Sequence, residues 1–203
     1  MSKILEDVEN TIEIKKSKFI TYLHRTSDEE EAKDFIKLIK KLHPDATHHC
    51  TAMIIGNVVR SNDDGEPSNT AGHPMLDVLS GNNMEDILAI VVRYFGGTLL
   101  GKGGLVRAYS SSVKEALNHA KLTQTIPLNE YFIQFGYEWI GKIDQFFRNN
   151  NIQILSKDYE EKVIYHFLTP TDFKINEELQ ELSSGQIHPT FLQEVYKEHV
   201  IEP

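Results

Sequence analysis

The stretch VVRYFGGTLLGKGGLVRAYSSSVKEAL, residues 91–117, decides the fold of the first half of the chain. It begins as an apolar strand, passes through five glycines between residues 96 and 104, and ends with the spacing of an amphipathic helix. The helix has an apolar stripe made of Leu105, Tyr109, Val113, Ala116, Leu117 and Ala120.

The glycine-rich turn resembles a nucleotide-binding loop, because Gly96, Gly101 and Lys102 match the spacing G-x-x-x-x-G-K. Such a loop needs Ser or Thr after the lysine to bind magnesium, and this chain has Gly103 there. We therefore expect no nucleotide hydrolysis and no cofactor. Two interpretations stay open: a helix start flanked by Lys102 and Arg107 that binds an anion, or a turn whose small residues permit close packing.

The charge of the chain is unevenly distributed. Its 203 residues carry a net charge of -9, with -6 in residues 1–86, +4 in residues 87–127 and -7 in residues 128–203. An acidic protein with one basic segment is a poor non-specific nucleic-acid binder, because affinity for phosphates grows with the number of cations. A local anion site stays open as one interpretation, and we expect no DNA sequence recognition.

The cysteine content and the first residues favour a cytoplasmic protein. Cys50 is the only cysteine, and MSKILEDVEN has neither a cationic leader nor an apolar core. No apolar run approaches the roughly 18 residues of a membrane span, so we expect no membrane association.

The pattern before the glycine loop predicts alternating strands and helices. A strand or hairpin bends near residues 15–17, and a capping box of Ser27 and Glu30 begins a helix that ends at His43 and Pro44. One strand is expected over residues 50–60, a short helix over 73–79 and a buried strand over 87–95.

The second half has the pattern of a ferredoxin-like domain. After a linker around Pro127, strands at 130–137, 151–158, 162–168 and 190–198 alternate with helices at 139–149 and 171–183. Pro170 is expected to open the second helix, and Gly185 to close it. This β-α-β-β-α-β order predicts an α+β protein with domains at residues 1–125 and 126–203.

The polar loop over residues 61–72 is long enough to be functional. Its carboxylates Asp63, Asp64 and Glu66, with His73 after them, form a possible loop site for a metal-dependent, peptidase-like hydrolase. A calcium loop fails, because placing Gly65 at the sixth position puts residues 60 and 71 where acids are required.

Histidine and cysteine side chains cluster weakly, and a serine triad has little support. The zinc-like set of His43, His48, His49, Cys50 and His73 fails, because adjacent residues of a strand face opposite ways, so we expect no metal site. Ser68, His73 and Asp77 are close in sequence but lack the G-x-S-x-G elbow of a serine hydrolase.

Four segments together resemble the YigZ/IMPACT family: EIKKSKFI, HPDATHHC, RSNDDGEPSNTAGHP and the opening stretch. The match is dense from about residue 13 to 120, and the second half is similar to the C-terminal domain of bacterial members. Lys102 occupies a position that varies in the family. The family's motif residues found here are Arg60, Ser61, Asp63, Asp64, Gly65, Glu66, Pro67, Gly72, Arg93, Tyr94, Phe95, Gly96, Gly97, Gly101, Gly103, Gly104, Leu105, Arg107 and Ala108.

The resemblance implies an N-terminal domain like domain IV of elongation factor G, a fold shared with a small-subunit ribosomal protein, and a C-terminal domain like domain V of that factor. Eukaryotic members regulate translation in the stress response to amino-acid starvation by competing for the activator of an initiation-factor kinase. They carry a different N-terminal domain that we do not expect here, so that partner is not transferred to this chain. The leading hypothesis is a non-enzymatic regulator of translation that binds ribosome, RNA or a regulatory protein, and the hydrolase is the alternative. The candidate binding residues are Arg60, Arg93, Gly96, Gly97, Gly101, Lys102, Gly103, Gly104 and Arg107.

Two further expectations concern the arginines. Arg107 should help to dock an anionic group at the helix start. Arg60 and Arg93 could each instead pair with Asp63, Asp64 or Glu66, in a network that holds the two loops together.

Overall fold

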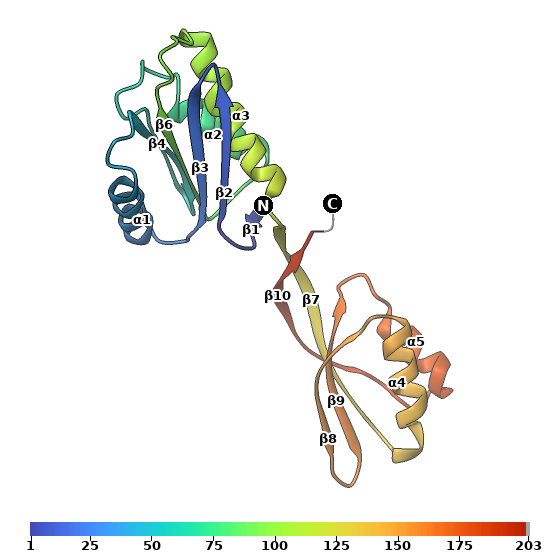
Figure 1. The fold of residues 1–203 in the computed structure, drawn as a ribbon. Helices are drawn as coiled ribbons and strands as arrows, with labels where there is room; N and C mark the ends of the chain where they lie inside the picture. Colours follow the sequence, from blue (N-terminus) through green and yellow to red (C-terminus); the bar gives the residue numbers. More distant parts are fainter. Residues whose placement is uncertain (202–203) are drawn as a thin grey trace. The chain divides into compact units, whose positions relative to one another are not determined.

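The computed structural model describes residues 1–201, which form two compact units. One unit is Met1–Gln124 with the described residues from His199 onward, and the other is Thr125–Glu198. Each unit combines a sheet with helices (Figure 1), so the chain has the predicted two-domain α+β architecture. No helix within residues 1–201 is long and apolar enough to cross a membrane.

The first unit is built on a five-stranded antiparallel sheet with strand order β2-β3-β6-β4-β5. Both β3 and β4 run antiparallel to β6, so α1 joins two parallel strands that lie on either side of β6. The elements are β1 (Ser2–Ile4), β2 (Val8–Ile14), β3 (Ser17–Arg25), α1 (Glu29–Leu42), β4 (His48–Ile55), β5 (Val58–Asn62), α2 (Gly72–Gly81), β6 (Ile87–Tyr94) and α3 (Lys102–His119).

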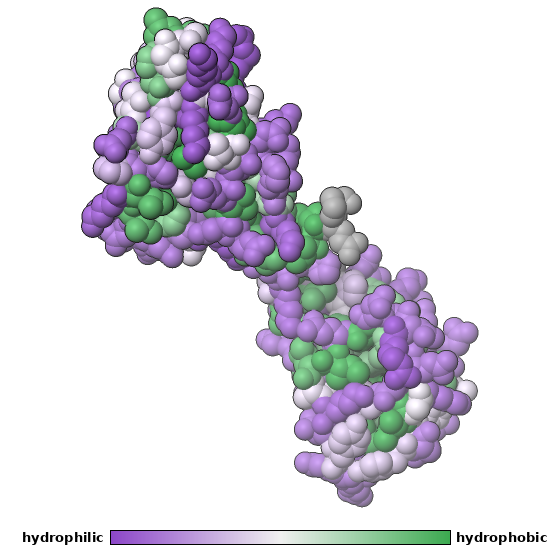
Figure 2. Space-filling model, viewed as in Figure 1, coloured by the Kyte–Doolittle hydropathy of each residue, from purple (hydrophilic) through white to green (hydrophobic). Residues whose placement is uncertain are grey.

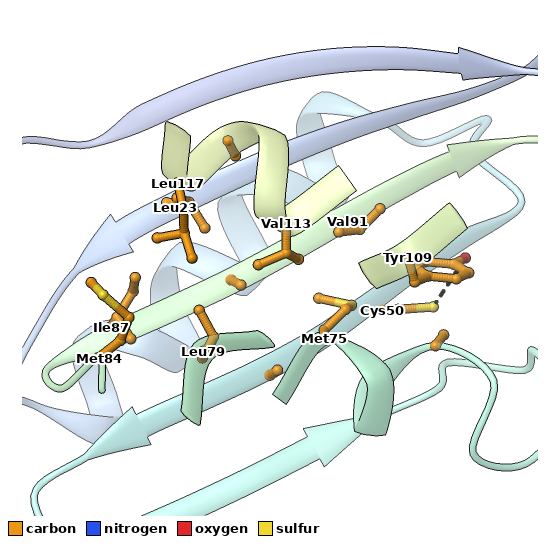
Figure 3. Packing of buried hydrophobic residues seen from close by; sticks show 14 of the residues in the cluster. Leu23, Cys50, Met75, Leu79, Met84, Ile87, Val91, Tyr109, Val113 and Leu117 are labelled. Atoms are coloured by element: carbon orange, nitrogen blue, oxygen red, sulfur yellow. Dashed lines mark hydrogen bonds between the residues drawn. The ribbon is translucent and has the colours of Figure 1, made fainter. Parts of the chain in front are cut away.

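Helices cover both faces of this sheet, with α1 on one face and α2 and α3 on the other. The central strand β6 is therefore apolar on both faces, since Val91 packs with α2 and α3 while Val92 packs with α1. Figure 3 shows Met75, Leu79 and Val113 meeting the sheet in the larger core. Arg93 follows on the same face as Val91, which places a charged side chain at the edge of this core.

Local sequence chemistry explains most element boundaries of the first unit. Lys15 and Lys16 both have positive φ in the turn between β2 and β3, where the hairpin is predicted. The helix cap is one residue later than predicted: Asp28 accepts hydrogen bonds from the N–H groups at 30 and 31. The single strand expected over 50–60 is a hairpin of β4 and β5, because Gly56 turns the chain with φ 54°.

The second unit has the ferredoxin-like order predicted from the sequence. Its strands are ordered β10-β7-β9-β8, with the first and third strands of the unit at the centre of the sheet. The core gathers side chains of β7 and β9, such as Ile133 and Phe167, against the helices. The elements are β7 (Leu122–Phe135), a short 3-10 helix (Tyr137–Trp139), α4 (Ile140–Asn149), β8 (Gln153–Tyr159), β9 (Val163–Pro170), α5 (Ile175–Ser183) and β10 (Thr190–Val200).

Two predictions at prolines are wrong. The linker expected around Pro127 is part of the continuous strand β7. That proline lies between the segment of β7 paired with β1 and the segment paired with β9. Pro170 ends β9 instead of opening a helix, and α5 begins only at Ile175.

Candidate functional site

A pocket of about 480 Å³ lies where β6 ends and β4 begins, which the register brings together by pairing Arg93 with His48. The polar loop of residues 63–72 forms one wall, and the glycine loop with the start of α3 forms another. The structure thus brings together four of the predicted site residues, which are Glu66, Arg93, Gly101 and Lys102.

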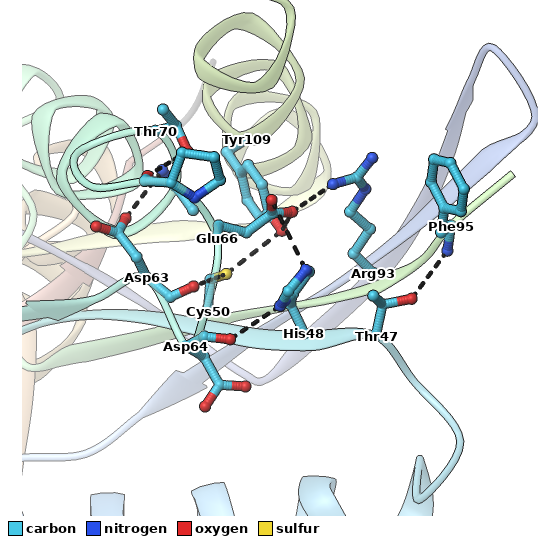
Figure 4. Close-up of polar contacts among 12 residues, drawn as sticks. Thr47, His48, Cys50, Asp63, Asp64, Glu66, Thr70, Arg93, Phe95 and Tyr109 are labelled. Atoms are coloured by element: carbon cyan, nitrogen blue, oxygen red, sulfur yellow. Dashed lines mark hydrogen bonds and ion pairs between the residues drawn. The ribbon is translucent and has the colours of Figure 1, made fainter. Parts of the chain in front are cut away.

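The floor of the pocket is a buried ion pair. Nη1 of Arg93 lies 2.5 Å from Oε1 of Glu66, and the two side chains are only 6% and 3% exposed. The hydroxyl of Tyr109 donates a second hydrogen bond to the same carboxylate oxygen, at 2.8 Å (Figure 4). Buried charges need such partners, so this triad fixes the polar loop to β6 and α3.

The guanidinium of Arg93 has several contacts, but not all of its hydrogen-bond donors are used. Its guanidinium carbon lies 5.5 Å from the ring centre of Phe19 and 5.7 Å from that of Phe95, at distances typical of cation–π contacts. Its Nε is buried and has no hydrogen-bond partner among the described residues. The guanidinium therefore keeps a donor that nothing in this part of the protein uses.

His48 links the ion pair to the polar loop. Its Nδ1 lies 2.9 Å from the backbone oxygen of Asp64, a carbonyl that can only accept, so Nδ1 carries the proton. Nε2 then faces Oε2 of Glu66 at 3.7 Å. The histidine orients the loop that carries Glu66.

The cysteine and the remaining histidines do not form a metal site. The thiol of Cys50 donates to the backbone oxygen of Asp63 at 3.0 Å, and burial raises its pKa to about 12, so it stays a neutral thiol. The ring of His49 turns instead toward the backbone oxygen of His43. No cluster of three or more potential metal ligands occurs within residues 1–201.

The acidic side chains of the loop serve different structural tasks. Asp63 accepts hydrogen bonds from the backbone N–H groups of Asn69, Ala71 and Gly72, and so closes the loop onto the start of α2. Asp64 accepts from the N–H of His49 and from Nζ of Lys40. Burial works to raise the pKa of Asp64, but these two donors outweigh it and leave the pKa below its usual value.

Arg60, His73 and Arg107 are among the predicted site residues that do not line the pocket. Arg60 pairs with Glu29 at 2.8 Å and reaches none of the loop carboxylates, so the pairing predicted for it is wrong, while that predicted for Arg93 is correct. His73 is 58% exposed, and its nearest charged neighbour is Asp77 at 3.9 Å. Arg107 is exposed and lines a neighbouring hollow with Lys15.

The glycines of the loop differ in whether they fit a turn that needs small residues for close packing or a helix start that binds an anion. A Cβ on Gly96 would lie 2.0 Å from the backbone of Lys16, so this glycine permits close packing. Gly97 and Gly101 adopt positive φ. Neither close packing nor a positive φ requires the glycine at position 103. Its φ is not positive, and the nearest atom to a Cβ there would be in the Arg107 side chain, 3.9 Å away.

The start of α3 is open to an anion. Its cap residue Gly101 has no side chain, and no acidic residue lies in the first turn, whereas Asp28 caps α1. Lys102 has no ion-pair partner among residues 1–201. Figure 2 shows apolar and neutral surface, in green and white, over the end of the first unit where α3 begins, next to hydrophilic side chains.

The fold and this site define a class of two-domain α+β proteins that carry a pocket in the first domain. A family model described as the Impact N-terminal domain matches residues 15–117, and one described as a domain of unknown function (DUF1949) matches residues 133–186. The chain belongs to the IMPACT family.

Similar proteins match along most of their length. IMPACT family member YvyE of Bacillus subtilis is 42% identical over 190 residues, which cover 90% of this chain and 87% of the relative. IMPACT family member YigZ of Escherichia coli is 39% identical over 189 residues, covering 90% and 93%. A solved structure titled as that of a hypothetical protein is 36% identical, with a TM-score of 0.59 and coverage of 95% and 97%.

Several residues that line the pocket, or bond to a residue that lines it, are not predicted from the sequence as site residues. Tyr109 was assigned only to the apolar stripe of its helix, although a buried tyrosine needs a partner for its hydroxyl. Leu99 and Leu100 in the glycine loop carried no signal of their own, because a leucine in a turn is ordinary until the fold places it at the mouth of a pocket.

Proposed function

We propose that this IMPACT-family protein acts in translation as a non-enzymatic binding protein. The pocket at the start of α3 contacts the ribosome, an RNA or a regulatory protein. The observation that carries this proposal is the uncapped start of α3, which opens with Lys102 into a pocket whose floor is the incompletely satisfied Arg93. Helix N-termini and arginine donors are general binding elements for phosphate and carboxylate groups.

Family membership supports the link to translation. The resemblance of the two domains to domains IV and V of elongation factor G makes a ribosomal partner a natural hypothesis, although a shared fold argues function only by analogy. The basic segment over residues 87–127, at +4 in a chain of -9, favours an anionic partner at this end of the first unit.

The hydrolase alternative receives no support from the geometry. Asp63 and Asp64 are engaged by backbone and lysine donors, Glu66 is engaged by Arg93, and His73 is exposed outside the pocket. A nucleophile, a base and a bound carbonyl need a common meeting point, and these four residues do not provide one.

Sedimentation of ribosomes with the tagged full-length protein tests the proposal. The protein should co-migrate with ribosomal particles at low salt, and Lys102→Ala with Arg107→Ala should weaken this association. Lys114→Ala, further along the same helix, is the matched control for charge. A protein that stays at the top of the gradient at every salt concentration would argue against a ribosomal partner.

A further inference from the structure

The walls of the pocket at the start of α3 are more apolar than its floor. Leu99, Leu100 and Leu105 line it together with the ring of Phe95. Leu99 is 84% exposed and Phe95 is 47% exposed. Exposed apolar side chains beside a pocket favour a ligand that covers them with apolar groups of its own.

The floor provides donors for a single anionic group. Arg93 is 5% exposed and retains a buried Nε–H without an acceptor among the described residues. An unsatisfied buried donor is costly, so a ligand oxygen that reached this guanidinium would gain more than it would at the surface. Arg93, which carries this donor, lines the same pocket as the start of α3 and belongs to a different element.

The start of α3 provides the second set of donors. Gly101 has no side chain that could cap the helix. Gly103, in the first turn, also adds no side chain there. A glycine in a helix is destabilising relative to alanine by about 0.5–1 kcal/mol, so its use here needs a reason other than packing. Room for a ligand to approach the backbone N–H groups is such a reason.

The local charge sets the number of negative charges that the pocket accommodates. Arg93 and Lys102 are cations and Glu66 is an anion, so these lining groups together carry one positive charge. One carboxylate neutralises this charge. A polyanion such as RNA needs a further cation for each further phosphate, and Arg93 and Lys102 are the only Arg or Lys among the lining residues.

We infer that the pocket binds a carboxylate carried by an apolar peptide segment of a partner protein. This inference rests on the proposed function, and among its three classes of partner it selects the protein. The carboxylate lies between Arg93 and the first turn of α3, and the neighbouring apolar side chains of the peptide cover Leu99 and Phe95.

Matched peptides test the inference by NMR on the isotope-labelled full chain. The probe is the tripeptide Leu-Leu-Asp with both ends blocked, and its controls are Leu-Leu-Asn and Gly-Gly-Asp. At millimolar concentration the probe should shift the backbone N–H signals of residues 101–104 and the Nε–H signal of Arg93. Both controls should shift them far less, because one lacks the charge and the other lacks the apolar side chains.

Variants locate the binding. Leu99→Ala should lower the affinity for the probe roughly tenfold, as expected for lost carbon contacts in an apolar pocket. Lys102→Ala should weaken it roughly threefold, as expected for one exposed charge. Lys114→Ala, outside the pocket on the same helix, should leave the affinity unchanged.

Three results would overturn the inference. Equal binding of the Leu-Leu-Asn peptide would show that the carboxylate is not recognised. Equal binding of the Gly-Gly-Asp peptide would show that the apolar wall does not contribute to binding. Shifts at residues 101–104 with a short single-stranded RNA, without shifts from the probe, would assign the pocket to RNA and leave the proposed function intact. Probe binding in a protein that never co-sediments with ribosomes, and binds no translation-regulatory protein, would instead contradict only the proposed link to translation.

Discussion

The two loops that flank the pocket use their polar groups in opposite ways. In the polar loop, Asp63, Asp64 and Glu66 are all occupied by donors from the protein itself. In the glycine loop and the helix start that follows it, Lys102 has no ion-pair partner within residues 1–201, and no side chain caps the helix. The acidic loop thus maintains the fold, and the glycine loop is the one that remains free for a partner.

This difference shows why a conspicuous cluster of carboxylates is a weak indicator of a binding site. Carboxylates beside glycine and asparagine are well suited to closing a loop through backbone N–H groups, and here they do so. A ligand site needs groups whose hydrogen-bonding capacity the fold has left unused.

The largest effect is expected from breaking the buried ion pair. Glu66→Leu leaves the guanidinium of Arg93 buried without its carboxylate, which should lower the free energy of unfolding by roughly 3 to 5 kcal/mol. Chemical denaturation of the two proteins measures this difference.

The control for this prediction is a double variant. Glu66→Leu combined with Arg93→Met removes both charges, and it should recover most of the lost stability because apolar replacements of buried pairs are often neutral. A loss below about 1 kcal/mol for Glu66→Leu alone would mean that the pair does not support the fold.

A smaller loss is expected from opening the polar loop. Asp63→Ala leaves the N–H groups of Asn69, Ala71 and Gly72 without their acceptor, which should cost about 1 to 3 kcal/mol. Thermal unfolding measures the loss, and Asp77→Ala, at an exposed site on α2, is the control. Equal melting temperatures for the two variants would contradict the structural role of Asp63.

The acid sensitivity of the fold should report Asp64. Its pKa is lowered in the folded protein, so its contribution to stability is complete above the usual carboxyl range near pH 4 and is lost as the pH falls through the lowered value. Asp64→Asn should therefore reduce stability at neutral pH and flatten the decline on acidification. Denaturation series at several pH values measure both, and parallel curves for the two proteins would contradict the prediction.

The smallest expected change in stability has the opposite sign. Gly103→Ala should raise the free energy of unfolding by about 0.5 kcal/mol, because alanine favours helix and no neighbour obstructs its Cβ. The same change should weaken association with the partner by crowding the helix start. Gly96→Ala is the contrasting variant, since its Cβ would collide with the Lys16 backbone. A Gly103→Ala protein that binds normally would remove the ligand from the first turn of α3.

The sequence predicted the elements more reliably than their side-chain partners. Periodicity located α3 and the ferredoxin-like order, because each depends on local pattern. The strand through Pro127 is not predicted, since that continuity depends on pairing with strands far away in the sequence, such as β1 and β9.

The candidate site was predictable only in part. An arginine in an apolar strand must find a carboxylate, and Glu66 was one of three candidates for Arg93. Arg60 pairs with Glu29 because α1 lies beside β5, and no local sequence pattern predicts that arrangement. The apolar wall contributed by Leu99 likewise exists only once the glycine loop is folded over the pocket.

One measurement tests the contrast between the two loops most directly: the melting temperature and the ribosome association of a Lys102→Ala, Arg107→Ala double variant, compared with Asp63→Ala. The double variant should melt within about 2 °C of the unchanged protein, as expected for surface substitutions, and should lose association. Asp63→Ala should lose stability while any protein that remains folded still associates. A folded double variant that associates as strongly as the unchanged protein would contradict the assignment of the glycine loop to partner binding.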